Sequence, residues 1–335
     1  MQSLTLQRSD PFTRNRLLRD GISQAIYEAM KEDPSIYLFG EGCVPKQHYD
    51  APYILKDFPE RIVTMPICED GSMNYAVGAS LLGVKPVVDL IGSDFLYRAM
   101  DSIANTAAKL DFVTRLDHTI VIRSECLTGG PTSGQRPEVL FTHIPGLRVV
   151  MPSTPRDAYG LMKTALAMPG VTLVFEDRMI QDGEFSPEDM EFKGPVPFGV
   201  SSWRVKGQRG NVTIVTYGIM RQRVERLLGQ YSFDGDRYAE EYNMLCDLID
   251  LRSLYPIDWA NISKMLERTG RLLVIEPDVQ YGGIGAEIAA TISERMPHVR
   301  VKRLGAPRTT IPASMALHDR MLPSEEEVRR AITEW

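Results

Sequence analysis

The sequence predicts an α/β protein made of two doubly wound domains, each a mainly parallel sheet covered by helices on both faces. Three observations support this prediction. The chain has 335 residues, which exceeds the usual size of one domain. Its 43% hydrophobic and 24% charged residues are typical of a globular protein. Short apolar runs alternate with longer amphipathic segments through residues 1–180 and again through 207–335, and an irregular, charged stretch at 181–206 is the predicted linker.

The first domain is expected to open with a helix over residues 13–31, because Leu18, Ile22 and Ile26 share one helical face. The apolar run 35–39 follows as a buried strand, and several prolines predict a loop over 43–59. The other predicted elements are strands at 85–90, 119–123, 147–151 and 171–175, helices at 98–110 and 154–168, a helical turn at 138–141, and a loop at 124–137 rich in Gly, Pro, Ser and Thr.

The second domain is expected to repeat this alternation of strand and helix. Its predicted elements are strands at 211–216, 245–251, 271–276 and 298–302, helices at 220–231, 259–269 and 286–295, and an irregular acidic stretch at 232–242. The glycine-rich turn at 282–285 lacks the GxGxxG spacing of a dinucleotide-binding site. We therefore assign this turn to close packing of a helix against a strand.

Charge and cysteine content exclude several classes of protein. A net charge of −6, without a basic stripe, argues against a nucleic-acid partner. The four cysteines lack CxxC spacing and predict reduced thiols in a cytoplasmic protein. The first twenty residues contain no apolar signal region, and no eighteen apolar residues run together, so we expect neither secretion nor a membrane span. No His, Cys and Asp cluster has metal-ligand spacing.

Three predicted strand ends carry candidate binding residues. Glu69 lies between a strand-like run and small and apolar residues at helical spacing, so it is predicted to sit at a strand-to-helix turn. Ligand crevices form at the carboxyl ends of parallel strands, where partial desolvation raises the proton affinity of a carboxylate. Glu41 and Phe95 follow two other predicted strands. From the residues alone, Glu69 as an ordinary helix N-terminus, Glu41 as a solvated loop acid and Phe95 as a core aromatic all remain open.

Several motifs together resemble one known family. The runs PICEDG, DFLYRAMDSIANTAAKL, HIPGLRVVMPSTPRDAYGLMKTAL, DLRSLYPID and GGIGAEIAATI are similar to the beta subunit of the thiamine-diphosphate-dependent 2-oxo-acid dehydrogenase decarboxylating components. That family has pyruvate, branched-chain and acetoin members and is related to the transketolases. The resemblance extends over residues 14–323 and implies an N-terminal pyrimidine-binding domain and a C-terminal transketolase-type domain.

The resemblance also implies roles for individual residues. Glu69 matches the glutamate that bonds the aminopyrimidine ring of the cofactor, Glu41 a second acid near the thiazolium, and Phe95 the aromatic that stacks on the pyrimidine. The cofactor would then form a carbanion that attacks a 2-oxo acid, with the acyl unit passed to an acceptor. No convincing GDG…N element for diphosphate and Mg²⁺ is present. That element belongs to an alpha subunit in the family, so the resemblance implies a two-alpha, two-beta heterotetramer and a chain inactive by itself.

One loop departs from the family pattern. Ser133 stands where family members carry a histidine that assists proton transfer to a lipoyl arm, and a serine hydroxyl cannot act as a comparable acid. Gln135 and Arg136 are candidate substrate-binding residues, since a guanidinium can hold a carboxylate or phosphate; Arg136 as a surface or interface residue remains an alternative. His48 is a candidate replacement for the missing histidine, although a lone loop histidine is usually solvated.

Three functions therefore remain open. The chain is expected to be the beta subunit of a 2-oxo-acid dehydrogenase-type decarboxylase, with a lipoyl or acyl-carrier domain as a further candidate partner. The first alternative is a split thiamine carboligase or transketolase-like enzyme that makes a C–C bond, as in an acyloin, and Ser133 favours it. The second alternative is a non-catalytic structural subunit.

Overall fold

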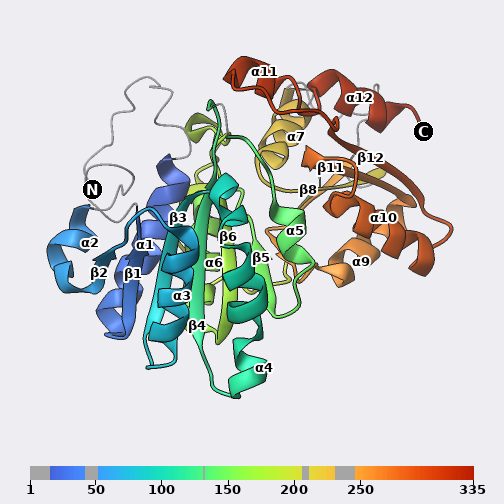
Figure 1. The fold of residues 1–335 in the computed structure, drawn as a ribbon. Helices are drawn as coiled ribbons and strands as arrows, with labels where there is room; N and C mark the ends of the chain where they lie inside the picture. The colour runs from blue at the N-terminus through green and yellow to red at the C-terminus, as the bar shows by residue number, and fades with distance from the viewer. Residues whose placement is uncertain (1–15, 42–51, 131–132, 206–210, 231–245) are drawn as a thin grey trace.

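The protein contains two sheets with helices packed on both faces (Figure 1). The computed structural model describes residues 16–41, 52–130, 133–205, 211–230 and 246–335. The larger sheet has seven strands in the order β10-β5-β6-β4-β3-β1-β2, and the smaller has five in the order β12-β11-β8-β9-β7. The predicted α/β class with two doubly wound halves is therefore confirmed.

Parallel pairing dominates both sheets. The first sheet contains β1 (Ile36–Gly40), β2 (Ile62–Thr64), β3 (Lys85–Gly92), β4 (Thr119–Cys126), β5 (Leu147–Val150), β6 (Gly170–Asp177) and β10 (Ser253–Tyr255). The second contains β7 (Ser202–Val205), β8 (Val212–Thr216), β9 (Cys246–Asp250), β11 (Arg271–Val279) and β12 (Arg300–Ala306). Among these described strands, only the pairs β10 with β5 and β7 with β9 are antiparallel. The carboxyl ends of the parallel strands consequently gather at one edge of each sheet.

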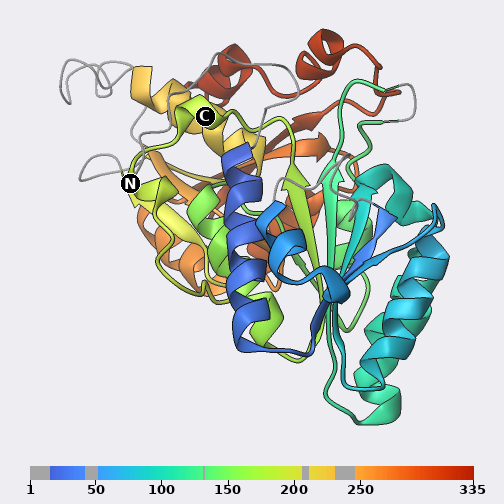
Figure 2. The same cartoon turned by 90° about the vertical axis from the view of Figure 1, so that its left-hand side faces the viewer.

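Helices cover the two faces of the first sheet. On one face α1 (Arg16–Glu32) packs against α6 (Pro155–Ala167), and α3 (Glu69–Ser80) covers the other face (Figure 2). The remaining α-helices are α2 (Pro52–Asp57), α4 (Leu110–Thr114), α5 (Glu138–Thr142), α7 (Ile219–Gln230), α9 (Trp259–Thr269), α10 (Ile284–Arg295), α11 (Met315–Asp319) and α12 (Glu325–Thr333). Among the helices of the described residues, none has the length and hydrophobicity needed to cross a bilayer.

Apolar side chains from both sheets share the core. One buried cluster contains Val87 of the first sheet and Ile214 of the second, and the other contains Val88 and Ile249. Successive residues of β3 thus point into different clusters, as the two-residue repeat of a strand requires. Each buried cluster therefore contains side chains from both sheets.

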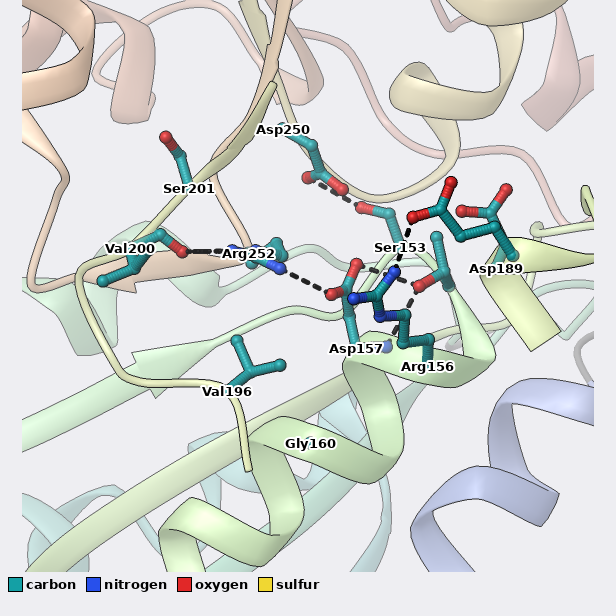
Figure 3. A network of polar contacts seen from close by, with 12 residues as sticks. Ser153, Arg156, Asp157, Gly160, Asp189, Val196, Val200, Ser201, Asp250 and Arg252 are labelled. Carbon is teal, nitrogen blue, oxygen red and sulfur yellow. Dashed lines mark hydrogen bonds and ion pairs between the residues drawn. The ribbon is translucent and has the colours of Figure 1, made fainter. Parts of the chain in front are cut away.

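Polar contacts reinforce this junction, and Figure 3 shows them at close range. Arg252 adopts a left-handed φ of 59° and donates from Nη1 to Oδ1 of Asp157 at 2.7 Å. Ser153 donates from Oγ to Oδ1 of Asp250 at 3.0 Å. Burial raises the pKa of Asp250 to about 7, and the negative charge of Asp157 adds to this shift. Ser153 precedes α6 and Asp157 lies in its first turn, while Asp250 ends β9 and Arg252 follows it. The two halves therefore meet through hydrogen bonds as well as apolar packing.

Several predicted elements were wrong in detail. Residues 43–59 were expected to be a loop, but Pro52–Asp57 is helical, because a proline at the first helical position loses no internal hydrogen bond. The predicted helix 98–110 contains the π-helical turn Ser102–Thr106 and a 3₁₀ turn, and its widened turn lets Ser102 contact Asp70 of α3. The strand β4 extends to Cys126, so the loop after it begins later than residue 124.

Some elements were not predicted at all. The expected linker contains β7, which joins the second sheet, and β10 returns to the edge of the first sheet beside β5. The helices α11 and α12 follow the last predicted strand. These strands have three or four residues each, so they carry too little periodicity to be recognised before their pairing partners are known.

Candidate functional site

The structure brings Glu41 and Glu69 together at the carboxyl end of β1. Glu41 follows the last residue of β1, and its Oε1 accepts a hydrogen bond from the backbone N–H of Cys68 at 2.8 Å. Cys68 directly precedes Glu69, which is the first residue of α3 and is only 7% exposed. The positive end of the α3 dipole favours a carboxylate at this position. Two acids from separate strand ends therefore border the same small region.

A third acid, Asp89, comes close to this pair from the neighbouring strand. Gly40 pairs with Asp89 in the sheet, and a Cβ added to Gly40 would lie 2.4 Å from the Asp89 carbonyl oxygen. Burial raises the pKa of Glu41 above its ordinary value, the N–H of Cys68 opposes that shift, and the charges of Glu69 and Asp89 add to it. Glu41 consequently holds a proton more readily than a solvated glutamate. This edge can share a proton with a nitrogen of a bound ligand.

Phe95 lies in a turn that is tied to the loop containing Gln135. The 3₁₀ turn Ser93–Tyr97 follows β3 directly, and Phe95 is half-buried within it. Ser93 donates from Oγ to the carbonyl oxygen of Gln135 at 2.9 Å, and the N–H of Gln135 donates to Oδ1 of Asp94 at 3.0 Å. Two hydrogen bonds therefore fix the backbone of Gln135 against the turn that carries Phe95, while the Gln135 side chain is exposed.

Arg136 points into the protein. Its side chain is buried, with Nη2 2.9 Å from Oδ1 of Asp177 and Nη1 3.7 Å from Oε1 of Glu138. Asp177 lies at the end of β6 and also accepts the backbone N–H of Ile219 at 2.9 Å. The guanidinium charge is therefore balanced by internal carboxylates. Of its nitrogens, Nη2 is hydrogen-bonded to Asp177, whereas Nε and Nη1 are buried without a hydrogen-bond partner among the described residues.

Of the two remaining predicted residues, Ser133 and His48, the structure describes Ser133. Ser133 is half-buried, and its N–H donates to the carbonyl oxygen of Gly130 at 3.2 Å. His48 lies outside the described residues. Residues 131–132 also lie outside them, so the loop before Ser133 is described only in part.

Sequence reasoning missed a group of buried acids behind the Gln135 loop. Burial raises the pKa of Glu138 to about 8, with the charge of Asp278 adding to the shift and that of Arg136 opposing it. Burial likewise raises the pKa of Asp278 to about 7. Glu276, at the end of β11, is buried as well, and burial raises its pKa to about 7. Charged residues at the ends of apolar strand runs, as in LVFED and VIEPDV, were the available signal.

Neither the cysteines nor the acids form a metal centre in the described part of the chain. No group of three or more His, Cys, Asp or Glu side chains has an arrangement that could hold a metal ion there. Cys68, Cys126 and Cys246 are unpaired thiols. Burial raises the pKa of the Cys246 thiol to about 12, so this thiol is a poor nucleophile.

Comparisons with known proteins agree on both halves of the chain. The family model of the transketolase pyrimidine binding domain matches residues 16–181, and that of the transketolase C-terminal domain matches residues 201–328. The chain is 30% identical to "Pyruvate dehydrogenase E1 component subunit beta" of Rickettsia bellii, over 94% of this chain and 97% of that protein. It is also 30% identical to "2-oxoisovalerate dehydrogenase subunit beta 2, mitochondrial" of Arabidopsis thaliana, over 94% of this chain and 87% of that protein.

A solved structure, "Split gene transketolase, inactive beta4 tetramer", is similar in fold. Its TM-score is 0.76 at 23% sequence identity, and the match covers 94% of this chain and 96% of that one.

Proposed function

The chain belongs to the transketolase-type family with a pyrimidine-binding domain followed by a transketolase C-terminal domain, and from this we propose that it is the beta subunit of a thiamine-diphosphate-dependent 2-oxo-acid decarboxylating enzyme. Its relatives are named beta subunits of pyruvate and 2-oxoisovalerate dehydrogenases. The observation that carries the proposal is the buried Glu69 at the first turn of α3, with Glu41 held beside it by the N–H of Cys68.

The residues at this edge fit an aminopyrimidine ring. When bound, thiamine diphosphate would supply the electron sink for decarboxylation of a 2-oxo acid. Glu69 would hold a proton at a nitrogen of the pyrimidine, since a carboxylate within hydrogen-bond reach of a ring nitrogen can share a proton with it. Glu41, whose pKa is already raised by burial, would keep the edge from accumulating two negative charges. Phe95 would offer an aromatic face to the ring.

We propose that an alpha subunit is the partner and that it supplies the site for the diphosphate. Within the described residues, no cluster of acids could hold Mg²⁺. Large apolar side chains before, within and after α3 are exposed: Ile67 by 86%, Tyr75 by 54% and Leu82 by 86%. A partner subunit that covered α3 would bury these side chains, and at the Ile67 end it would also border the cofactor site. We propose that the alpha subunit carries the diphosphate and Mg²⁺ in a two-alpha, two-beta assembly.

A second candidate function is favoured by Ser133. Without the family histidine, the loop has no acid of comparable strength for transfer to a lipoyl domain, whereas a carboligase that joins the acyl unit to an aldehyde or ketone does not need that transfer. The buried Arg136 beside Asp177 is a further departure in the same loop. A third candidate, a non-catalytic subunit, would leave the buried Glu69, with Glu41 beside it, without a role.

Reconstitution separates these functions. The chain is mixed with its alpha partner, thiamine diphosphate, Mg²⁺ and a set of 2-oxo acids. Release of CO₂ with acyl-lipoamide supports the dehydrogenase, release with a hydroxyketone supports the carboligase, and no turnover supports the structural subunit.

Replacing Glu69 tests the site itself. Glu69→Gln should lower turnover by roughly 10²-fold or more, because an amide cannot exchange the proton, whereas the exposed Glu60→Gln should leave it unchanged. Full activity of the Glu69→Gln enzyme would contradict the proposed role of this residue. Turnover by the chain without an alpha partner would contradict the proposed assembly.

A further inference from the structure

A pocket of about 550 Å³ lies at the carboxyl end of β12, away from Glu69. It is bordered by the loop after β11, the end of β12 and the turn between α11 and α12. The lining includes Gln280, Tyr281, Arg303, Arg308, Arg320 and Glu327. Its volume is in the range of small-molecule sites in proteins.

The lining carries an excess of positive charge. Three guanidinium groups and one carboxylate give a net charge of +2, although the whole chain has a net charge of −6. Within the described ranges, none of these three arginines forms an ion pair. By contrast, the neighbouring Arg226 is paired with Glu325 at 2.8 Å. The charge of Arg303 also acts on the buried Glu276 and opposes the rise of its pKa, whereas Arg308 and Arg320 are exposed.

The single acid of the pocket is already engaged elsewhere. Glu327 accepts at Oε2 from the backbone N–H of Ser324 at 2.9 Å and from its Oγ at 2.7 Å, which completes the N-terminal capping box of α12. These bonds hold its carboxylate toward the helix end. Within the described residues, Glu327 forms no ion pair with the three arginines, and its single charge offsets only part of theirs.

Two arginines are positioned by contacts that leave N–H groups available. Arg303 donates from Nη1 to the carbonyl oxygen of Gln280 at 3.0 Å, which uses one of its five N–H groups. The Arg308 guanidinium carbon lies 5.5 Å from the centroid of the Tyr281 ring, and this ring is 80% exposed. Such a contact orients the planar guanidinium without consuming its hydrogen-bond donors.

We propose that this pocket binds a phosphate-bearing small molecule through Arg303, Arg308 and Arg320. The planar fork of a guanidinium matches two phosphate oxygens, and several forks around one cavity can contact the same group. The proposal does not depend on the proposed catalytic function, because it uses no residue of the Glu69 edge.

Titration calorimetry of the purified chain with pyrophosphate tests the proposal. Binding should be saturable, with one site for each chain, and should weaken as salt is added. Arg303→Gln and Arg308→Gln should each weaken binding roughly tenfold or more, because each removes a charge-assisted hydrogen bond. Arg300→Gln is the matched control, since Arg300 begins the same strand at its opposite end. This control should bind pyrophosphate as the unmodified chain does.

Glu327→Gln gives a change in the opposite direction. Glutamine can also complete a capping box, so α12 should be retained while the only negative charge of the lining is removed. Pyrophosphate should then bind several-fold more tightly. An absence of saturable binding, equal losses in the Arg300→Gln control, or equal affinity for citrate would each overturn the proposal.

Discussion

Replacing Arg136 by methionine tests whether its charge is held inside the protein or is available to a substrate. Methionine has a similar length and fills a similar volume, so the main change is the loss of the guanidinium. In the structure this group lies 2.9 Å from Asp177 and 3.7 Å from Glu138, and both acids are fully buried. The substitution therefore leaves two buried acids without their cation.

The expected loss in the free energy of unfolding is about 3 kcal/mol. Removing one member of a buried ion pair costs about 3–5 kcal/mol. The lower end applies because Asp177 keeps backbone N–H bonds from Met179 at 3.0 Å and Ile219 at 2.9 Å. Glu138 can take up a proton instead of remaining charged, since burial already raises its pKa to about 8.

Urea unfolding followed by tryptophan fluorescence measures this loss. For a chain of this size the midpoint should move by about 1 M urea, given a slope of about 3 kcal/mol per M. The control is Arg115→Met, an exposed arginine whose replacement should change the free energy by less than about 0.5 kcal/mol. If Arg136→Met costs no more than this control, the guanidinium is not part of a buried pair, and the interpretation of Arg136 as a substrate-binding residue gains support.

Three further predictions follow from the same structure. Burial raises the pKa of Glu138 to about 8 and the pKa values of Asp250 and Asp278 to about 7. As pH rises, these carboxyl groups therefore lose their protons at lower pH in the unfolded chain than in the folded protein. The free energy of unfolding should therefore fall as pH rises from about 4.5 to 8, and Glu138→Gln should make this fall smaller. A free energy of unfolding that rises over this range would contradict the raised pKa values of these acids. Ser324→Ala removes the capping hydroxyl of α12 and should cost about 1 kcal/mol in urea unfolding, whereas Ser314→Ala, at a helix start without a side-chain cap, should cost less. Gly92→Ala places a Cβ 2.4 Å from Cδ1 of Leu127 and 3.3 Å from Phe95, so the Leu127 side chain must shift and the change should cost about 1 kcal/mol. The matched Gly78→Ala, with no atom within 4 Å, should stabilise α3, and equal effects of the two would refute the packing argument.

The sequence by itself determined the class of fold and most of its longer elements. The helix that became α1 and the strands that became β3 and β6 are each long enough for a repeat of 3.6 or 2 residues to be visible. Glu69 was placed correctly at the start of a helix, because the change from strand pattern to helix pattern occurs at that residue. The strands β7 and β10 were missed, since a strand of three or four residues has no measurable repeat and is defined by the neighbour it pairs with.

Tertiary structure alone decided which charges meet. The sequence places Arg136 in a polar loop, where a free cation is expected, yet its side chain lies against Asp177, which is 41 residues later in the chain. The contact between Glu41 and the N–H of Cys68 likewise spans 27 residues. The pocket arginines Arg303 and Arg320 become neighbours only because α11 and α12 fold back over the end of β12. Local periodicity reports which face of an element is buried, whereas the partner of a buried charge depends on strand order and register, which no single segment encodes.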